Sequence, residues 1–268
     1  MGNFYQAVTG NKSKEGLFLD IYSGSIGAYS LRKIRSAYSG DCIEVYNGTS
    51  YADIGFDSSD LLDLTALANH CGSNDGIVSK WYDQSTEGHT AVQTSITLMP
   101  KIYDGTTGVE LDNSKPTLQW TNKYMTAQGV EINGAMASVS VADIDYSTLA
   151  AALWAIIDSF NDGSEVLGLP ANTIRYALDS NDTDITETAR RMLLFTSYDT
   201  STKTFSVDGS VTTASVTTSN NATGLEIGRR LNGNSYTGSI QSLIFWGNDQ
   251  SAKRADIETA LNDYYSIY

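Results

Sequence analysis

The sequence predicts an all-β protein, a β-sandwich or barrel with short helices near the N-terminus and one helix at the C-terminus. Short runs typical of β-strands alternate with turn clusters from about residue 100 onward. The 268 residues include 16 Tyr and 23 Gly but only 3 Pro, a composition that suits pleated strands and the turns between them. In FSVDGSVTT, Asp208 and Gly209 lie between alternating residues and favour a two-residue hairpin.

The N-terminal part is predicted to hold an arm followed by small elements. Residues 1–16 are polar and interrupted by glycine, and we expect them to be an arm that attaches to a larger assembly. A single sandwich domain is expected over 17–268, beginning with the apolar run LFLDIY. Residues 27–40 have apolar side chains at helical spacing, which predicts a short helix with a basic outer face.

The next elements follow from capping and periodicity. CIEVY (42–46) and GIVSKWY (76–82) are predicted to be strands. Between them, residues 57–72 are predicted to be a helix capped by Ser or Asp. Its apolar face is expected to consist of Leu64, Leu67, Ala68 and Cys71.

The rest of the chain is predicted to be strands up to a closing helix. The expected strands are KIYD, PTLQW, ASVSVADI, LAAALWAII, SEVLGL, TIRYAL, RRMLLFTSY, KTFSVDGSVTTASV, GLEIG and GSIQSLIFW. In 251–268, Ile257, Leu261 and the Tyr264–Tyr265 pair form a helical apolar stripe, and Ser251 is the expected N-cap.

Charge and cysteine content limit the class of protein. The net charge of −14 disfavours binding to nucleic acid or to an anionic membrane surface. The start of the chain lacks the apolar core of a signal peptide and no run is long enough to span a bilayer, so we expect folding in a cytoplasm. Cys42 and Cys71 are expected to be two buried thiols rather than a disulfide.

Two further groups of residues are candidate sites. The segment DSNDTDITE offers Asp179, Asp182 and Asp184 as weak candidates for binding Ca²⁺, although their spacing does not match an EF-hand loop. A solvated acidic loop is the favoured interpretation, with no cofactor. The tryptophans are expected in the core, unless one stacks on a sugar from an exposed rim; they are Trp81, Trp120, Trp154 and Trp246.

AYSLRKIRSAYSG, ADIGF and NDGIVSKWYDQS together resemble a region of the catalytic domain of family-54-type α-L-arabinofuranosidases. The same region is similar to parts of tailed-phage virion proteins. TFSVDGS and the final strand and helix resemble concanavalin-A-like domains, so the resemblance implies a concanavalin-A-like jelly roll. The residues that mark it are Ala28, Tyr29, Ser30, Arg32, Trp81, Tyr82, Asp83, Gln84 and Ser85.

The resemblance also implies where catalytic residues would lie. Retaining glycosidases need two carboxylates about 5–5.5 Å apart. The family nucleophile is a Glu in a Gly-Asn-Ala-Glu setting, and the nearest match here is Glu165 in NDGSE. The family acid is an Asp in a turn that here reads IGRRLNGNSYTG, which offers Arg229, Arg230 and Asn232 but no acid. The neighbouring cysteines of the family are also missing, so no enzymatic activity is expected.

The sequence therefore predicts a non-catalytic structural protein on the surface of a phage particle, either a capsid decoration or head-fibre protein or a tail or fibre component. Asp83 is expected to cap backbone N–H groups, with Gln84 and Ser85 satisfying others, so Trp81–Ser85 is interpreted as a structural corner. Expected partners are other virion proteins, further copies in a homo-oligomer such as a trimer, and a host surface glycan. The alternatives are a glycan-binding receptor-recognition module and an arabinofuranosidase-like glycosidase.

Overall fold

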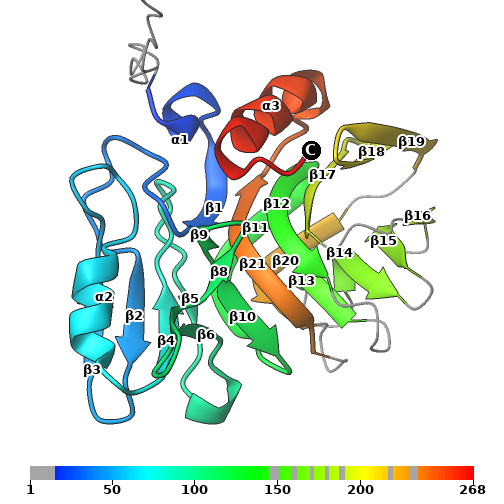
Figure 1. The fold of residues 1–268 in the computed structure, drawn as a ribbon. Coiled ribbons are helices and arrows are strands. Elements are labelled where there is room, and N and C mark those ends of the chain that lie inside the picture. Colours follow the sequence, from blue (N-terminus) through cyan, green and yellow to red (C-terminus); the bar gives the residue numbers. More distant parts are fainter. Residues whose placement is uncertain are drawn as a thin grey trace, which may run out of the picture.

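The computed structural model shows two β-sheets packed face to face, with helices against their outer sides and ends (Figure 1). The structure describes residues 16–144, 151–157, 162–169, 172–178, 181–186, 191–216, 220–229 and 235–268. The expected arm lies almost entirely outside these described residues. The all-β sandwich predicted from the sequence is confirmed.

One layer, the front sheet, is antiparallel throughout. In spatial order its strands are β3 (Tyr51–Ile54), β2 (Ile43–Tyr46), β4 (Gly76–Trp81), β5 (Ala91–Val92), β11 (Met125–Gly134), β20 (Asn220–Ile227), β13 (Ala151–Ile157), β14 (Asp162–Leu169), β15 (Thr173–Leu178) and β16 (Asn181–Thr186).

The other layer, the back sheet, is built around β21 (Thr237–Trp246). Along one edge of β21, β1 (Ser25–Ser30) pairs with its C-terminal part and β10 (Leu118–Thr121) with its N-terminal part. Beyond β10 lie β6 (Lys101–Asp104) and β7 (Gly108–Val109). On the other side lie β12 (Met136–Ile144), β17 (Arg191–Tyr198), β18 (Thr202–Val207) and β19 (Ser210–Ser215). A ladder between β4 and β6 joins the two sheets. A separate small hairpin is formed by β8 (Leu111–Asp112) and β9 (Lys115–Pro116).

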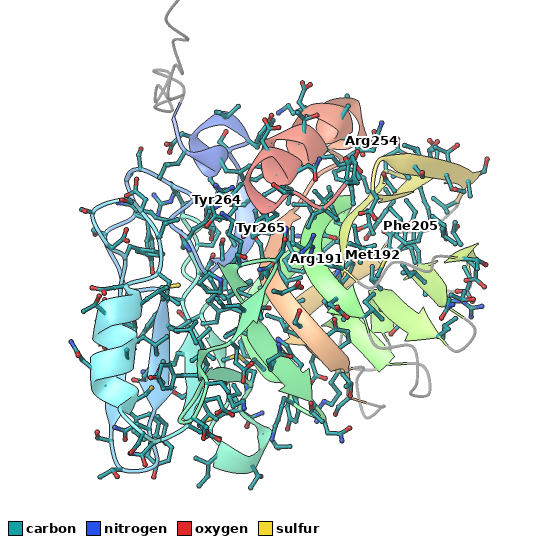
Figure 2. All side chains as sticks on the ribbon, viewed as in Figure 1. Arg191, Met192, Phe205, Arg254, Tyr264 and Tyr265 are labelled. Carbon is teal, nitrogen blue, oxygen red and sulfur yellow. The ribbon has the colours of Figure 1, made fainter. Side chains whose placement is uncertain are left out.

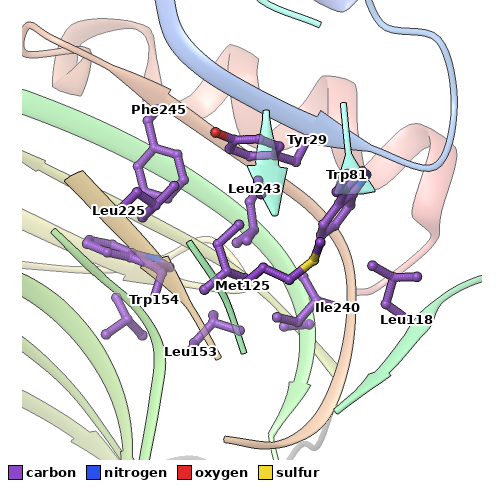
Figure 3. Close-up of a cluster of buried hydrophobic side chains, with 14 of the residues drawn as sticks. Tyr29, Trp81, Leu118, Met125, Leu153, Trp154, Leu225, Ile240, Leu243 and Phe245 are labelled. Atoms are coloured by element: carbon purple, nitrogen blue, oxygen red, sulfur yellow. The ribbon is translucent and has the colours of Figure 1, made fainter. Parts of the chain in front are cut away.

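Aromatic and aliphatic side chains fill the space between the sheets (Figure 3). Trp154 of the front sheet meets Phe245 of the back sheet edge-on, with ring centroids 5.2 Å apart. Tyr29 and Trp81 make a second contact between the layers, at 5.9 Å. Such large buried rings supply most of the apolar area that a sandwich removes from water.

The outer face of the back sheet is apolar and covered. Helix α3 (Arg254–Tyr265) and helix α1 (Phe18–Ile21) lie on this side of the sheet (Figure 1). The buried residues shared between these helices and the strands include Val139, Phe195 and Leu261. This face is therefore a second core. Helix α2 (Leu64–Cys71) instead contributes Leu67 and Cys71 to the cluster between the sheets.

The predicted helix over 27–40 is wrong. Its first residues form β1, in which Gly27 is the partner of Phe245 and Tyr29 the partner of Leu243. Ala28 and Tyr29 are both fully buried, one on each face of the back sheet. Pairing with a strand more than 200 residues away outweighed the local helical spacing.

Other local predictions need smaller corrections. The helix expected over 57–72 is only α2, with Asp63 as its N-cap, and Leu64 is exposed rather than on the buried face. Ser251 belongs to the 3₁₀ turn η2 (Ser251–Lys253) and does not cap α3. A second 3₁₀ turn, η1, spans Ile96–Leu98.

The strongest local signals are confirmed. Asp208 and Gly209 both have positive φ, and they connect β18 to β19 as the predicted two-residue hairpin. In α3, Ile257, Leu261 and Tyr265 are buried as expected. Cys42 and Cys71 are buried free thiols. Among the described residues, no helix combines the length and the apolar character that crossing a membrane would require.

Candidate functional site

The outer face of the front sheet differs from that of the back sheet because it carries a line of opposed polar and small residues. Each neighbour in this line is a direct backbone partner across one ladder, so all its side chains project from the same face. From β4 to β16 the line consists of Lys80, Val92, Thr126, Glu226, Ala155, Glu165, Ala177 and Asp182. We call these residues the outer row.

Two buried glutamates stand in the middle of the outer row. Glu165 on β14 and Glu226 on β20 are both partners of Ala155 on β13, which lies between them. Their Cα atoms are therefore two strand spacings apart, about 10 Å. Only 4% of Glu165 and 3% of Glu226 is exposed. Two carboxylates that flank a small residue on one sheet face can act on opposite sides of a bound molecule.

Glu226 is held by an arginine three residues later. Arg229 donates from Nε to Oε2 at 2.8 Å and from Nη2 to Oε1 at 2.5 Å. Its guanidinium also stacks on Tyr124, 3.5 Å from the ring centroid. The hydrogen bond to Glu226 raises the pKa of Arg229. Gly228 has a positive φ, and an added Cβ there would lie 2.7 Å from the Lys123 carbonyl oxygen, so the turn that returns Arg229 to Glu226 favours glycine.

Glu226 is not among the site residues predicted from the sequence. The residue lies in GLEIG, which was recognised only as a strand. Leu225 and Ile227 on either side of it are buried in the core between the sheets, so the alternation places Glu226 on the outer face. A charged residue inside an apolar strand run was the signal that could have identified it.

Next to Glu165 lies an arginine with two acidic partners. Arg175 on β15 interacts electrostatically with Glu165. It also donates to Asp184 through Nε at 2.7 Å and through Nη2 at 2.8 Å. Its Nη1 lies 2.6 Å from Asp182. The hydrogen bond to Asp184 is the main cause of a raised pKa for Arg175.

These contacts correct the prediction of a solvated acidic loop. Asp182 and Asp184 lie on strand β16 and are paired with a guanidinium rather than arranged around a cation. Asp179 lies outside the described residues. Within the part of the chain that the structure describes, no group of three or more His, Cys, Asp or Glu side chains is placed to hold a metal ion.

The floor between the two glutamates is made of small side chains. Ala152 and Ala155 are fully buried on the outer side and contact Leu169. A β-bulge between Ala152 and Trp154 turns both Leu153 and Trp154 into the core, and Ala155 then returns to the outer face. The residue that separates the two glutamates therefore has only a methyl group as its side chain.

The YDQS corner lies at the end of β4, away from the two glutamates along the sheet. The Asp83 carboxylate accepts from the backbone N–H of Ala28 at 2.7 Å and of His89 at 2.8 Å, and from the Ser85 hydroxyl at 2.6 Å. Tyr29 donates its hydroxyl to the His89 carbonyl. Asp83 thus binds the start of the back sheet to the loop that follows β4.

Gln84 makes equally complete contacts. Its Oε1 accepts from the Ile34 N–H at 2.9 Å, and its Nε2 donates to the carbonyls of Ser30 at 2.9 Å and Arg32 at 3.0 Å. Arg35 donates to the Gln84 carbonyl at 2.7 Å. These hydrogen bonds satisfy the backbone N–H and C=O groups of the irregular segment after β1. The Gln84 side chain therefore has a structural role.

The remaining marker residues are dispersed. Trp81 is buried, and Tyr82 donates to Asp53 at 2.6 Å on the outer side of the front sheet. Burial and this hydrogen bond raise the pKa of Tyr82. Arg32 stacks on Tyr264, 3.9 Å from its centroid. Tyr264 lies near the C-terminal end of α3 (Figure 2).

No tryptophan is available for stacking on a sugar. Each of the four is fully buried, as the core interpretation predicted; they are Trp81, Trp120, Trp154 and Trp246. The turn IGRRLNGNSYTG is the one in which the resemblance places the family acid. The structure describes Arg229 of this turn, whereas Arg230 and Asn232 lie outside the described residues.

Comparison with known proteins shows which solved structures share this fold. No protein-family model and no curated protein matches the sequence. A GH54 α-L-arabinofuranosidase soaked with a cyclic sulfate inhibitor aligns with a TM-score of 0.70 at 12% identity, covering 91% of this chain and 64% of that chain. An arabinofuranosidase complexed with arabinofuranosyl-α-1,2-xylobiose gives 0.68 at 13% identity with the same coverage of both chains. Trypanosoma rangeli sialidase in complex with sialic acid gives 0.52 at 10% identity, covering 70% of this chain and 32% of the sialidase.

The chain thus spans about 64% of the length of these arabinofuranosidases, and at such identities the likeness establishes a shared fold. The predicted resemblance to this fold is confirmed. The prediction of no enzymatic activity is contradicted, because these structural neighbours are glycosidases. That prediction depended on finding one carboxylate where two are needed, and Glu226 places a second beside Glu165.

Proposed function

We propose that the protein hydrolyses glycosidic bonds with Glu165 and Glu226. The observation that carries the proposal is that both carboxylates project from one sheet face on either side of Ala155. Two carboxyl groups that flank a glycosidic bond are the minimum machinery for this reaction. The glycosidase fold of the structural neighbours supports the same reaction class.

Charge assigns the roles of the two glutamates. Side chains two strands apart on one face start about 10 Å apart at Cα. Inverting glycosidases hold their carboxyl groups at about 6.5–9.5 Å, with a water between one of them and the sugar, whereas retaining enzymes need about 5–5.5 Å. Glutamate side chains that start from these positions can bring their carboxyl groups to either range, so the anomer released distinguishes the two mechanisms. Arg229 balances the negative charge of Glu226, so Glu226 suits the ionised carboxylate that activates water or attacks the sugar, and Glu165 suits the acid that protonates the departing oxygen.

The substrate class follows from charge. A net charge of −14 repels anionic polysaccharides at low salt, so we propose a neutral glycan as substrate. Lys80, at the β4 end of the outer row, is already paired with Glu44 at 2.8 Å. It therefore does not add an unbalanced positive charge for an acidic sugar.

The test is hydrolysis of a panel of aryl glycosides and neutral polysaccharides by the wild-type protein, Glu165→Gln and Glu226→Gln. We expect release of reducing sugar by the wild type and a loss of about 100-fold or more in each variant. Glu131→Gln, at an exposed position on β11, is the matched control and should keep full activity. Proton NMR of the first anomer released distinguishes inversion from retention. Absence of turnover on the whole panel, or activity that survives both substitutions, would rule the proposal out.

The expected place on a phage particle stays a prediction that rests on the sequence resemblance. The same holds for the homo-oligomer, the virion partners and the host glycan. Mass spectrometry of purified particles is the direct check: peptides of this chain in stoichiometric amount are expected, and their absence would contradict a virion location.

A further inference from the structure

A pair of tyrosines lies on the same outer face, several strands from the glutamates. Tyr46 on β2 and Tyr51 on β3 are direct partners, and their rings stack with centroids 4.7 Å apart and planes 34° from parallel. Tyr51 is 52% exposed, which makes it one of the most exposed large apolar side chains among the described residues. An exposed ring face held at a fixed angle can stack on the C–H face of a sugar.

The turn beneath the pair holds it rigid. Tyr46 donates its hydroxyl to the Gly48 carbonyl at 2.7 Å. Asn47 accepts from the N–H groups of Thr49 and Ser50 at 3.0 and 2.9 Å, and donates to the His70 carbonyl of α2 at 2.8 Å. A platform that is already ordered loses little conformational entropy when a ligand binds.

A depression of about 650 Å³ adjoins the platform and offers both apolar and polar contacts. Its apolar lining comes from Tyr46, from Ile77 and from Ile96, which is 50% exposed. Its polar lining includes Ser73, Asn74 and Asp75, whose carboxylate also accepts from the Gly105 N–H at 2.9 Å. An apolar wall with a few polar groups is the arrangement with which proteins recognise small polar ligands such as sugar rings.

Charge and position specify the ligand. Asp53 lies next to Tyr51 on this face and Asp75 lines the depression, so an anionic glycan would be repelled. Glu44 is connected to Glu226 through directly opposed residues of the front sheet. The four strand spacings from β2 to β20 amount to about 19 Å. One extended chain can therefore reach both the tyrosines and the carboxylates.

We infer that Tyr46, Tyr51 and the adjoining depression form an auxiliary binding site for a neutral polysaccharide, which holds one part of the chain while another part lies over Glu165 and Glu226. The inference rests on the proposed function for its substrate class, but binding at the tyrosines does not need catalysis. Linking two weak contacts on one chain raises the local concentration of the second.

The experiment separates the two proposals. Affinity electrophoresis in gels containing neutral polysaccharides, followed by calorimetry with the best ligand, compares the wild type with Tyr51→Ala, Tyr51→Phe and Glu165→Gln. We expect Tyr51→Ala to weaken binding about ten-fold, whereas Tyr51→Phe retains it because the ring face is kept. Glu165→Gln should still bind.

Hydrolysis gives the second readout. Tyr51→Ala should raise KM for the polymer and leave the hydrolysis of small aryl glycosides unchanged. Circular dichroism and urea unfolding show whether Tyr51→Ala is folded, and Tyr51→Phe retains the cross-strand stack. Equal binding by wild type and folded Tyr51→Ala, or binding lost in Tyr51→Phe as well, overturns the auxiliary site. Binding that depends on Tyr51 without any hydrolysis overturns the proposed function and supports the site.

Discussion

The two outer faces of the sandwich are built on the same strand alternation but differ in chemistry. On the back sheet, outward residues such as Val139 and Phe195 are apolar and are buried under α3 and α1. On the front sheet, the corresponding positions include Glu226, Glu165 and Lys80. Burying charge is costly, so a sheet face keeps carboxylates when their chemistry is used or when they are paired. This difference between the faces supports the proposal that the front face binds the substrate while the back face stabilises the fold.

The largest expected effect is a loss of stability when the packing on the back face is disrupted. Leu261 on α3 is 1% exposed, and Leu261→Ala should lower the free energy of unfolding by about 2–5 kcal/mol, because a cavity replaces its side chain. The matched change on the front face is Val92→Ala, where the side chain is 37% exposed and the expected loss is below about 0.5 kcal/mol. Urea unfolding of both variants makes the measurement. Similar losses at the two positions would show that the faces do not differ in this way.

An intermediate effect is expected at the corner that connects the sheets. Gln84 is fully buried, and Gln84→Met would remove its hydrogen bonds to Ile34, Ser30 and Arg32 without much change in volume. Leaving these buried backbone groups without hydrogen-bond partners should lower the free energy of unfolding by about 3 kcal/mol. Urea unfolding measures this loss. If the variant nevertheless hydrolyses substrates at the wild-type rate while folded, the corner is structural. A large loss of kcat in the folded variant would instead give it a direct role.

The smallest effect concerns the half-buried Lys80–Glu44 pair of the front face. Burial alone would raise the pKa of Glu44, but hydrogen bonds from Lys80 and Ser79 bring it below its ordinary value of 4.5. The stability that this carboxylate contributes is therefore present above pH 4.5 and lost as the pH falls through its lowered folded value. Glu44→Gln should be less stable than the wild type at pH 7 by under about 1 kcal/mol and equal to it near pH 2. A difference that grows in acid would contradict this assignment.

The fold could be predicted from the sequence where the signals were local. The Asp208–Gly209 hairpin needs only two residues that tolerate positive φ, and the closing helix needs only its own apolar stripe. The predicted helix over 27–40 was wrong because β1 pairs with β21, and a window of a dozen residues contains no information about that distant strand. The strand β16 was missed for the same reason, since its aspartates are accommodated by Arg175 on the neighbouring strand.

Only one of the two candidate catalytic glutamates could be predicted from the sequence. Glu165 was noticed through a family pattern, but its partner Glu226 lies 61 positions later and becomes its neighbour only through the register of β14, β13 and β20. The family pattern pointed instead to the turn that contains Arg229, and the expected acid is not there. Sheet register brings together residues that no spacing rule connects, so the second carboxylate required the structure.

The central claim, that the outer face of the front sheet is where the protein meets its substrate, is tested most directly by a crystal structure of Glu165→Gln soaked with a neutral oligosaccharide that the wild type cleaves. We predict a sugar ring over Ala155 between Gln at position 165 and Glu226, with the chain extending toward Tyr51. A sugar bound on any other face, with the row from Lys80 to Asp182 empty, would contradict the claim.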